Sequence, residues 1–184
     1  MHKRSYAEAK AYYQRHRLAA YTRVRVALAD AFPELRLAEI DARALAARRR
    51  QWTEAHPSGS GGWDWETLAE KYRRDPAAFT LALWSGDLLC GLAVGSASQR
   101  RTTGERAAVS VHFVESIPRR MHPMKGDVGL IATTAVAAYG TAIGATHVRL
   151  ANPLEGAVHL YVALGFRIVR RHGRIVYCER EIGS

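Results

Sequence analysis

The stretch ANPLEGAVHLYVALGFRIV, residues 151–169, contains the pattern that decides the fold. It follows a short extended run (146–150), passes through an amphipathic segment (154–164) and leads into a second extended run. An amphipathic helix between two strands is typical of a crossover that returns the chain to its sheet. Tyr161 stands inside this segment, just ahead of Leu-Gly-Phe, and its role depends on what the rest of the chain builds around it.

The preceding half of the chain supplies more strands and one unusual helix. Residues 79–84 and 88–98 are extended runs joined by Ser-Gly-Asp, which predicts a hairpin, and residues 107–116 are a third run. From Gly129 the sequence GLIATTAVAAYGTAIG is small and apolar on nearly every side. Such a segment predicts a helix that is buried on most of its surface.

The remaining elements complete an α/β fold. A strand is expected over 34–40, helices after the capping residues Asp41 and Asp64, a flexible loop over 56–62, and a terminal hairpin over 167–182. The order of these elements predicts a central mixed, twisted sheet of about seven strands, flanked by helices and containing a parallel pair.

Residues 1–33 predict a helical extension in front of the domain that spans 34–184. Ser5 and Glu8 have the spacing of a capping box at the start of a helix over 5–31, and Pro33 ends it. Two interpretations of this basic helix stand: it packs on its own domain or a second copy, or it binds a partner protein or nucleic acid. Its expected apolar stripe is Tyr6, Ala9, Tyr13, Leu18, Tyr21, Val24 and Leu28.

Composition narrows the class of protein. The chain has 184 residues, a net charge of +10 and two cysteines, Cys90 and Cys178, which lie in apolar runs without metal-binding spacing. We therefore expect buried thiols in a reducing compartment, no metal site, no membrane association and a cytoplasmic location. The positive charge attracts anions, which include nucleic acid, acidic proteins and phosphorylated cofactors, and does not choose among them.

The motif in the opening stretch resembles one found in the GNAT superfamily of acyl-CoA-dependent N-acetyltransferases. The resemblance extends over about residues 34–182 and implies a GNAT-like fold with an extra N-terminal helix. It also implies that acetyl-CoA is the co-substrate. The positions that carry the resemblance are Asn152, Ala157, Leu160, Tyr161, Leu164, Gly165 and Phe166.

The loop ESIPRRMHPMKGDVG, residues 115–129, would hold the cofactor. The resemblance implies that the turn and the start of the next helix bind the pyrophosphate, which suits the positive end of a helix dipole. The loop departs from the usual family pattern, because Met124 stands where Arg or Gln is expected and Asp127 where the first glycine is expected. The implied cofactor-binding residues are Phe113, Val114, Lys125, Gly126, Val128, Gly129 and Asn152.

The resemblance also implies catalytic roles. Tyr161 would protonate the thiolate of departing CoA, and a phenol is a competent acid at neutral pH; the alternative is a core residue with its hydroxyl at the surface. Glu115 would act as general base, directly or through water, or else pair with an arginine. His112 is the other titratable candidate, and strand alternation places it on the opposite face from Glu115 unless a bulge intervenes.

The acceptor side is expected near the loop SGSGGWDWE, residues 58–66. Trp63 and Asp64, with His112, would bind the acceptor amine by cation–π contact and charge pairing; the alternatives are helix capping for Asp64 and core or dimer contacts for the tryptophans. The sequence predicts transfer of acetyl from acetyl-CoA to a primary amine by direct attack in a ternary complex. A polyanionic acceptor and a homodimer are left open, and the rival function is a catalytically inactive GNAT-like binding module.

Overall fold

The computed structural model describes residues 5–55, 61–98, 107–172 and 175–183. The helices are α1 (Tyr6–Ala27), α2 (Ala42–Gln51), α3 (Trp65–Arg73), α4 (Val128–Ile143) and α5 (Val158–Ala163), with a 3₁₀ turn at Glu155–Ala157. The strands are β1 (Leu35–Ala38), β2 (Phe79–Ser85), β3 (Leu88–Ser98), β4 (Ala108–Ser116), β5 (His147–Ala151), β6 (Arg167–His172) and β7 (Ile175–Glu181).

The described strands form one mixed sheet of seven strands in the order β1-β2-β3-β4-β5-β7-β6. Neighbouring strands are antiparallel except β4 and β5, which run parallel on either side of the crossover through α4. The predicted α/β class, the strand number and the parallel pair are therefore confirmed. The hairpin turn of the last two strands, residues 173–174, lies outside the described residues.

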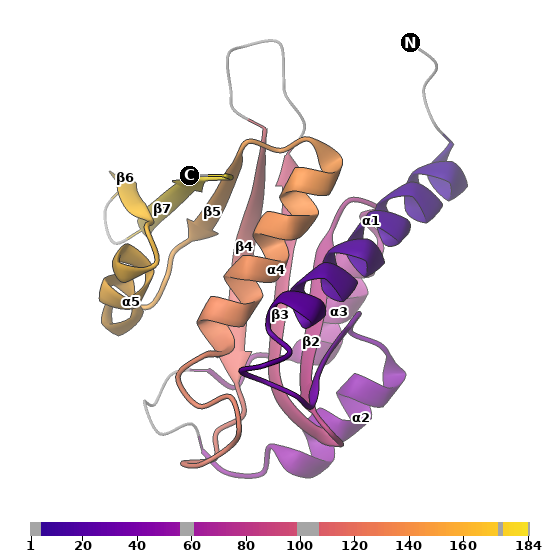
Figure 1. Cartoon of the computed structure of the whole chain (residues 1–184), viewed down its shortest axis with the longest axis vertical. Helices are drawn as coiled ribbons and strands as arrows, with labels where there is room; N and C mark the ends of the chain where they lie inside the picture. The colour runs from indigo at the N-terminus through magenta and orange to yellow at the C-terminus, as the bar shows by residue number, and fades with distance from the viewer. Residues whose placement is uncertain (1–4, 56–60, 99–106, 173–174, 184) are drawn as a thin grey trace.

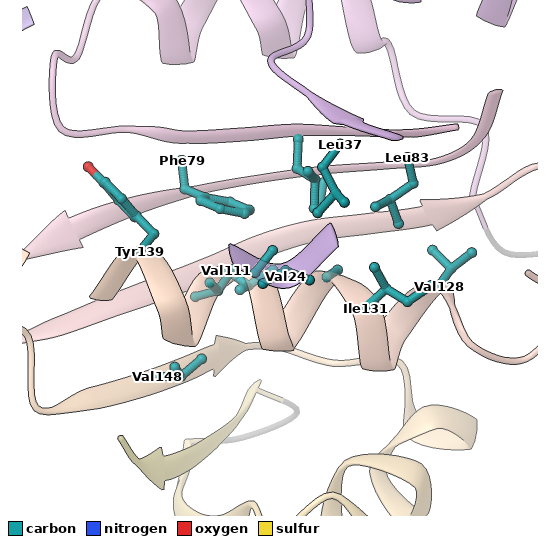
Figure 2. Packing of buried hydrophobic residues seen from close by; sticks show 14 of the residues in the cluster. Val24, Leu37, Phe79, Leu83, Val111, Val128, Ile131, Tyr139 and Val148 are labelled. Carbon is teal, nitrogen blue, oxygen red and sulfur yellow. The ribbon is translucent and has the colours of Figure 1, made fainter. Parts of the chain in front are cut away.

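Helices cover both faces of the sheet. In Figure 1, α1 and α4 lie over one face, and α2 and α3 lie behind the other. The core between α1, α4 and the sheet contains Val24, Phe79, Ile131 and Tyr139, several of which Figure 2 shows meeting across the two layers. The second core, around the fully buried Trp65, lies under α2 and α3. In the described part of the chain, no helix is both long enough and apolar enough to cross a membrane.

Capping residues set the starts of three helices as predicted. Ser5 accepts from the backbone of Glu8 and completes the capping box of α1, while Asp41 caps α2 and Asp64 caps α3. The predicted helix over 154–164 is shorter in the structure, because a 3₁₀ turn precedes α5. Cys90 and Cys178 are both buried, as expected.

The N-terminal helix differs from the expected one in length and in its buried face. α1 ends at Ala27 rather than at residue 31, and Tyr6 and Leu18 of the expected apolar stripe are 56% and 48% exposed. Arg17 is buried in their place at 8% exposure. Helical periodicity assigned Leu18 to the core, but the next position toward the N-terminus faces it.

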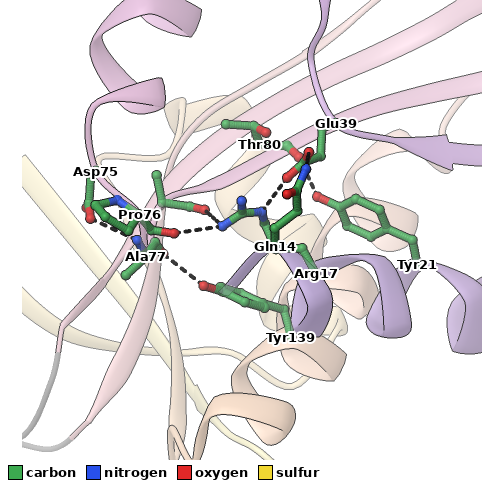
Figure 3. A network of polar contacts seen from close by, with 10 residues as sticks. Gln14, Arg17, Tyr21, Glu39, Asp75, Pro76, Ala77, Thr80 and Tyr139 are labelled. Carbon is green, nitrogen blue, oxygen red and sulfur yellow. Dashed lines mark hydrogen bonds and ion pairs between the residues drawn. The ribbon is translucent and has the colours of Figure 1, made fainter. Parts of the chain in front are cut away.

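Arg17 is tolerated in the core because polar partners surround its guanidinium (Figure 3). Its Nε donates to Glu39 Oε1 at 2.7 Å, and its Nη1 donates to the carbonyls of Pro76 and Ala78, each at 2.9 Å. Tyr21 donates to the carbonyl of Thr80 beside it. This buried arginine network joins α1 to the end of β1 and to the segment that leads into β2, so the helix packs on its own domain.

Candidate active site

The site lies where β4 and β5 separate. The two strands pair from Ala108 and His147 up to Val111 and Leu150, but β4 continues to Ser116. Parallel strands that diverge leave backbone groups without a ladder partner, which an extended ligand can use. A cleft of about 140 Å³ occupies the opening. Its described lining residues are Trp63, Val111, His112, Val114, Leu150, Ala151, Asn152, Pro153, Leu154, Ala157 and Tyr161.

A β-bulge in β4 decides which side chains share a face. Val94 of β3 pairs with Phe113 and the next residue, Gly95, pairs with Val111, so His112 is the extra residue. After the bulge, the Phe113 ring contacts Trp63 and the Glu115 carboxylate contacts Trp65, both beside α3, and the His112 ring lies 5.9 Å from Tyr72 of α3. From the sequence, His112 and Glu115 could share a face only if a bulge intervened. The bulge is present, and the two side chains lie on the same face.

Glu115 is buried and carries two short hydrogen bonds. It is 5% exposed, and its two carboxylate oxygens accept from the indole Nε1 of Trp65 and the backbone N–H of Gly62, each at 2.5 Å. Its partners are therefore an indole and a backbone amide rather than the arginine considered as an alternative. The carboxylate ties the start of α3 and the loop before it to β4, and it is absent from the described lining of the cleft.

Tyr161 is positioned by the end of α5. Gly165 has φ +84°, and the backbone N–H of Phe166 returns to the carbonyl of Tyr161 at 3.0 Å, which is a left-handed helix stop that favours glycine. The Leu-Gly-Phe motif therefore ends the helix and sends Phe166 into the core, where its ring packs at 6.0 Å from Tyr161. Asn152, also in the left-handed region with φ 53°, turns the chain between β5 and this segment.

The Tyr161 hydroxyl lies beside the first turn of α4. A Cβ built on Gly129 would lie 3.7 Å from this hydroxyl, so a glycine leaves the space between them open. Tyr161 is 8% exposed, and burial raises the pKa of its phenol. The group therefore keeps its proton at neutral pH and can donate it.

The start of α4 follows a glycine turn. Gly126 has φ +90°, which lets the chain reverse before Val128, and the side chain of the N-cap residue Asp127 makes no capping hydrogen bond. The first amides of a helix have no partner inside the helix, and they point toward its N-terminal end. Lys125 is exposed at this turn, whereas Met124 is 1% exposed and belongs to the core.

Of the three residues expected on the acceptor side, two line the cleft and the third does not. Trp63 lines the cleft, with its ring 5.3 Å from that of Phe113, and His112 lines it as well. Asp64 is exposed and bonds to Thr67, whose hydroxyl and backbone N–H lower the pKa of the carboxyl. Asp64 is thus the cap of α3 and is absent from the described lining of the cleft, while Trp65 is fully buried.

Two further histidines are buried. His122 is 9% exposed and bonds through Nε2 to Ser116 Oγ at 3.0 Å, and His147 is 7% exposed in β5. Sequence reasoning also missed Ser96 of β3, whose hydroxyl lies 2.9 Å from His112 Nε2. No local signal marks this serine, because the contact arises only from the pairing of β3 with β4. Among the described residues, no group of three or more acidic, histidine or cysteine side chains could hold a metal ion.

Comparisons with solved structures define the class of fold. No protein-family model matches the chain, and no curated protein sequence matches it significantly. Ard1 from Thermoplasma volcanium superposes with a TM-score of 0.59 at 15% identity, covering 82% of this chain and 99% of its own. An acetyltransferase of the GNAT family from Streptococcus pneumoniae gives 0.52 at 20% identity, covering 82% and 100%. The PaiA N-acetyltransferase from Thermoplasma acidophilum, solved with coenzyme A, gives 0.54 at 14% identity, covering 80% and 98%. The chain therefore has the fold of the GNAT acetyltransferases.

Proposed function

We propose that this protein is an N-acetyltransferase that moves the acetyl group of acetyl-CoA to a primary amine. One observation carries the proposal: the buried Tyr161 hydroxyl stands beside the first turn of α4, at the opening between β4 and β5. This arrangement combines a place for an anion, an unpaired strand edge and a proton donor. The GNAT-fold neighbours, one of them solved with coenzyme A, are acetyltransferases and do not favour the inactive binding module.

The cofactor would lie along β4 and end at α4. The pyrophosphate would accept hydrogen bonds from the first amides of α4, at Val128 and Gly129, and Lys125 and the Gly126 turn would support it. The pantetheine arm would pair with the backbone of Phe113 and Val114, where β4 has no partner in β5. Asn152 would close the opposite wall of the cleft.

The reaction would proceed by direct attack in a ternary complex. The neutral amine attacks the thioester carbonyl and forms the C–N bond, its nitrogen gives up a proton to a base, the C–S bond breaks, and the leaving thiolate takes the phenolic proton of Tyr161. Burial keeps that phenol protonated, so it acts as the acid. Trp63 offers an aromatic wall for the acceptor. The net charge of +10 favours an acceptor with anionic groups, since the field steers anions to the surface.

Two measurements test the proposal. Acetyl-CoA at about 100 times its Kd should stabilise the fold by about 2.7 kcal/mol, so thermal unfolding should shift upward by several degrees. Tyr161→Phe should lower turnover by about 10²- to 10⁴-fold while the affinity for acetyl-CoA barely changes. Tyr6→Phe, at an exposed position on α1, is the matched control. Unchanged turnover in Tyr161→Phe would remove this tyrosine from the mechanism, and no thermal shift at saturating acetyl-CoA would remove the proposed function.

A further inference from the structure

We propose that His112, held by Ser96, is the catalytic base that takes the proton from the attacking amine, in the place that sequence reasoning gave to Glu115. The inference rests on the proposed function, because it assigns a role within the same reaction. During attack the new C–N bond forms, the amine releases its proton to a ring nitrogen of His112, and Tyr161 returns a proton to the sulfur. One proton is taken and one is given, so no further reactant is needed.

The bulge in β4 places this histidine at the cleft. His112 is the additional residue between the pairs Val94–Phe113 and Gly95–Val111, so its ring projects out of regular alternation. It lines the same cleft as Tyr161. In the described lining these are the two titratable side chains, one from β4 and the other from α5. A base and an acid therefore face the space where the two strands separate.

Ser96 gives the ring a defined orientation. Its hydroxyl lies 2.9 Å from His112 Nε2, and Tyr72 of α3 packs against the ring. When Nε2 carries the hydrogen and donates it to the serine hydroxyl, Nδ1 keeps a lone pair that can accept a proton. A ring that is held in this way is ready to accept a proton without rotating, which is the usual reason for a second group behind a catalytic histidine.

Glu115 is less suited to the same task. Both of its oxygens already accept hydrogen bonds, from Trp65 and from Gly62. A proton added to the carboxylate would remove the negative charge that strengthens both of these hydrogen bonds. The carboxylate is therefore a positioning group for the loop and for α3.

The electrostatic surroundings agree with this assignment. The groups that face His112 are Lys71 and Tyr72 of α3, Ser96 of β3 and Tyr161 across the cleft. Burial, with a smaller contribution from Lys71, lowers the pKa of His112 below its ordinary value. The imidazole is thus neutral at pH 7 and free to accept a proton.

The first test needs no acceptor. Side-chain NMR of the histidines in the full chain should show His112 titrating below the usual value of about 6.5. Saturating acetyl-CoA should shift its signals, together with the amides of Val128 and Gly129. Ser96→Ala should abolish the fixed tautomer. If the α4 amides respond and the His112 signals do not, the histidine is remote from the thioester and the inference is overturned. If nothing responds, the proposed function itself fails.

The second test is kinetic, with an Ala-Ala amide as the acceptor, because an α-amine has a lower pKa than a lysine side chain. For wild type, kcat/KM should rise with pH through two ionisations, an acidic limb from His112 and a second limb at about pH 8 from the α-amine of the acceptor. His112→Gln should lower kcat/KM by about 10²- to 10⁴-fold and remove this acidic limb, while KM for acetyl-CoA stays unchanged. Added imidazole should restore part of the rate. His159→Gln, exposed on α5, is the matched control. A limb that survives in His112→Gln and disappears in Glu115→Gln would return the role to the glutamate.

Discussion

Arg17 illustrates how one residue can reverse an expectation from periodicity. Its neighbour Leu18 is the more apolar side chain, yet Leu18 is 48% exposed and Arg17 is buried. A charge is stable in a core only when hydrogen bonds and an opposite charge replace its water. Glu39 and two carbonyls from the segment before β2 provide them here. These partners are about 20 and 60 positions away in the sequence, so no local pattern could reveal them.

Arg17→Met should therefore destabilise the fold by about 3 kcal/mol, because the change leaves Glu39 without its positive partner, with only the hydrogen bond from Gln14, and takes the arginine donor from two carbonyls. The loss of stability should lie at the low end of the range for a broken buried ion pair, because the Glu39 side chain is 25% exposed and can regain water. Urea unfolding measures the change. Arg15→Met, on the exposed side of the same helix, should alter the free energy of unfolding by at most about 0.5 kcal/mol. Equal effects in the two variants would contradict the importance of the buried arginine network.

At the scale of elements, β4 carries most of the candidate site, and Gly95 of β3 permits its bulge. A Cβ built on Gly95 would meet the carbonyl oxygen of Ser110 closer than packed atoms can approach, and it would lie 3.1 Å from Val111 Cα, which is a tight contact. β3 and β4 can come together at the bulge only because this position has no side chain. The close approach then places His112 within reach of Ser96, one residue beyond the glycine.

Gly95→Ala should cost about 3 kcal/mol of stability, since backbone atoms rather than a flexible side chain must move. The same change should separate His112 from Ser96 and remove the fixed histidine tautomer from the NMR spectrum. Gly156→Ala is the control, because no atom lies within 4 Å of a Cβ at that position. A Gly95→Ala protein with unchanged stability and an unchanged His112 spectrum would show that the strands do not depend on this glycine.

The elements themselves were predictable where their signals are local. The caps at Ser5, Asp41 and Asp64 marked the helix starts, and the apolar sequence after Gly129 marked the buried helix. The Tyr161 hydroxyl lies beside α4, and its catalytic role stays a prediction. The bulge at His112, the partners of Glu115 and the contact with Ser96 were not predictable, because each depends on how distant strands pair.

On the scale of the whole molecule, the described part of the chain builds two cores from one sheet, and titratable groups are buried in them. Burial raises the pKa of the Cys90 thiol to about 11 and raises that of the Tyr21 phenol as well. Such groups stay protonated in the folded state at a pH where the unfolded chain has released its protons. Alkaline conditions should therefore favour unfolding.

The free energy of unfolding should fall as the pH rises from about 8.5, where an unfolded thiol ionises, to about 11, and the Cys90 share should reach up to about 2 kcal/mol. The sign follows because a raised pKa in the folded state means that the unfolded state binds fewer protons over this interval. Urea unfolding at a series of pH values measures the decline, and Cys90→Ala should flatten it. Parallel profiles for wild type and Cys90→Ala would show that this thiol is not the cause.

The buried arginine network also has a consequence for biosynthesis. The guanidinium of Arg17 needs a carbonyl 61 residues further along the chain, and α1 packs on α4, which is made later still. On the ribosome α1 emerges before the carbonyls that bind Arg17 and before α4, so its charge and its apolar face wait for these partners. Contacts of such long sequence separation slow folding and leave exposed surfaces that chaperones bind. Helix α1 should accordingly be among the last parts of the domain to dock.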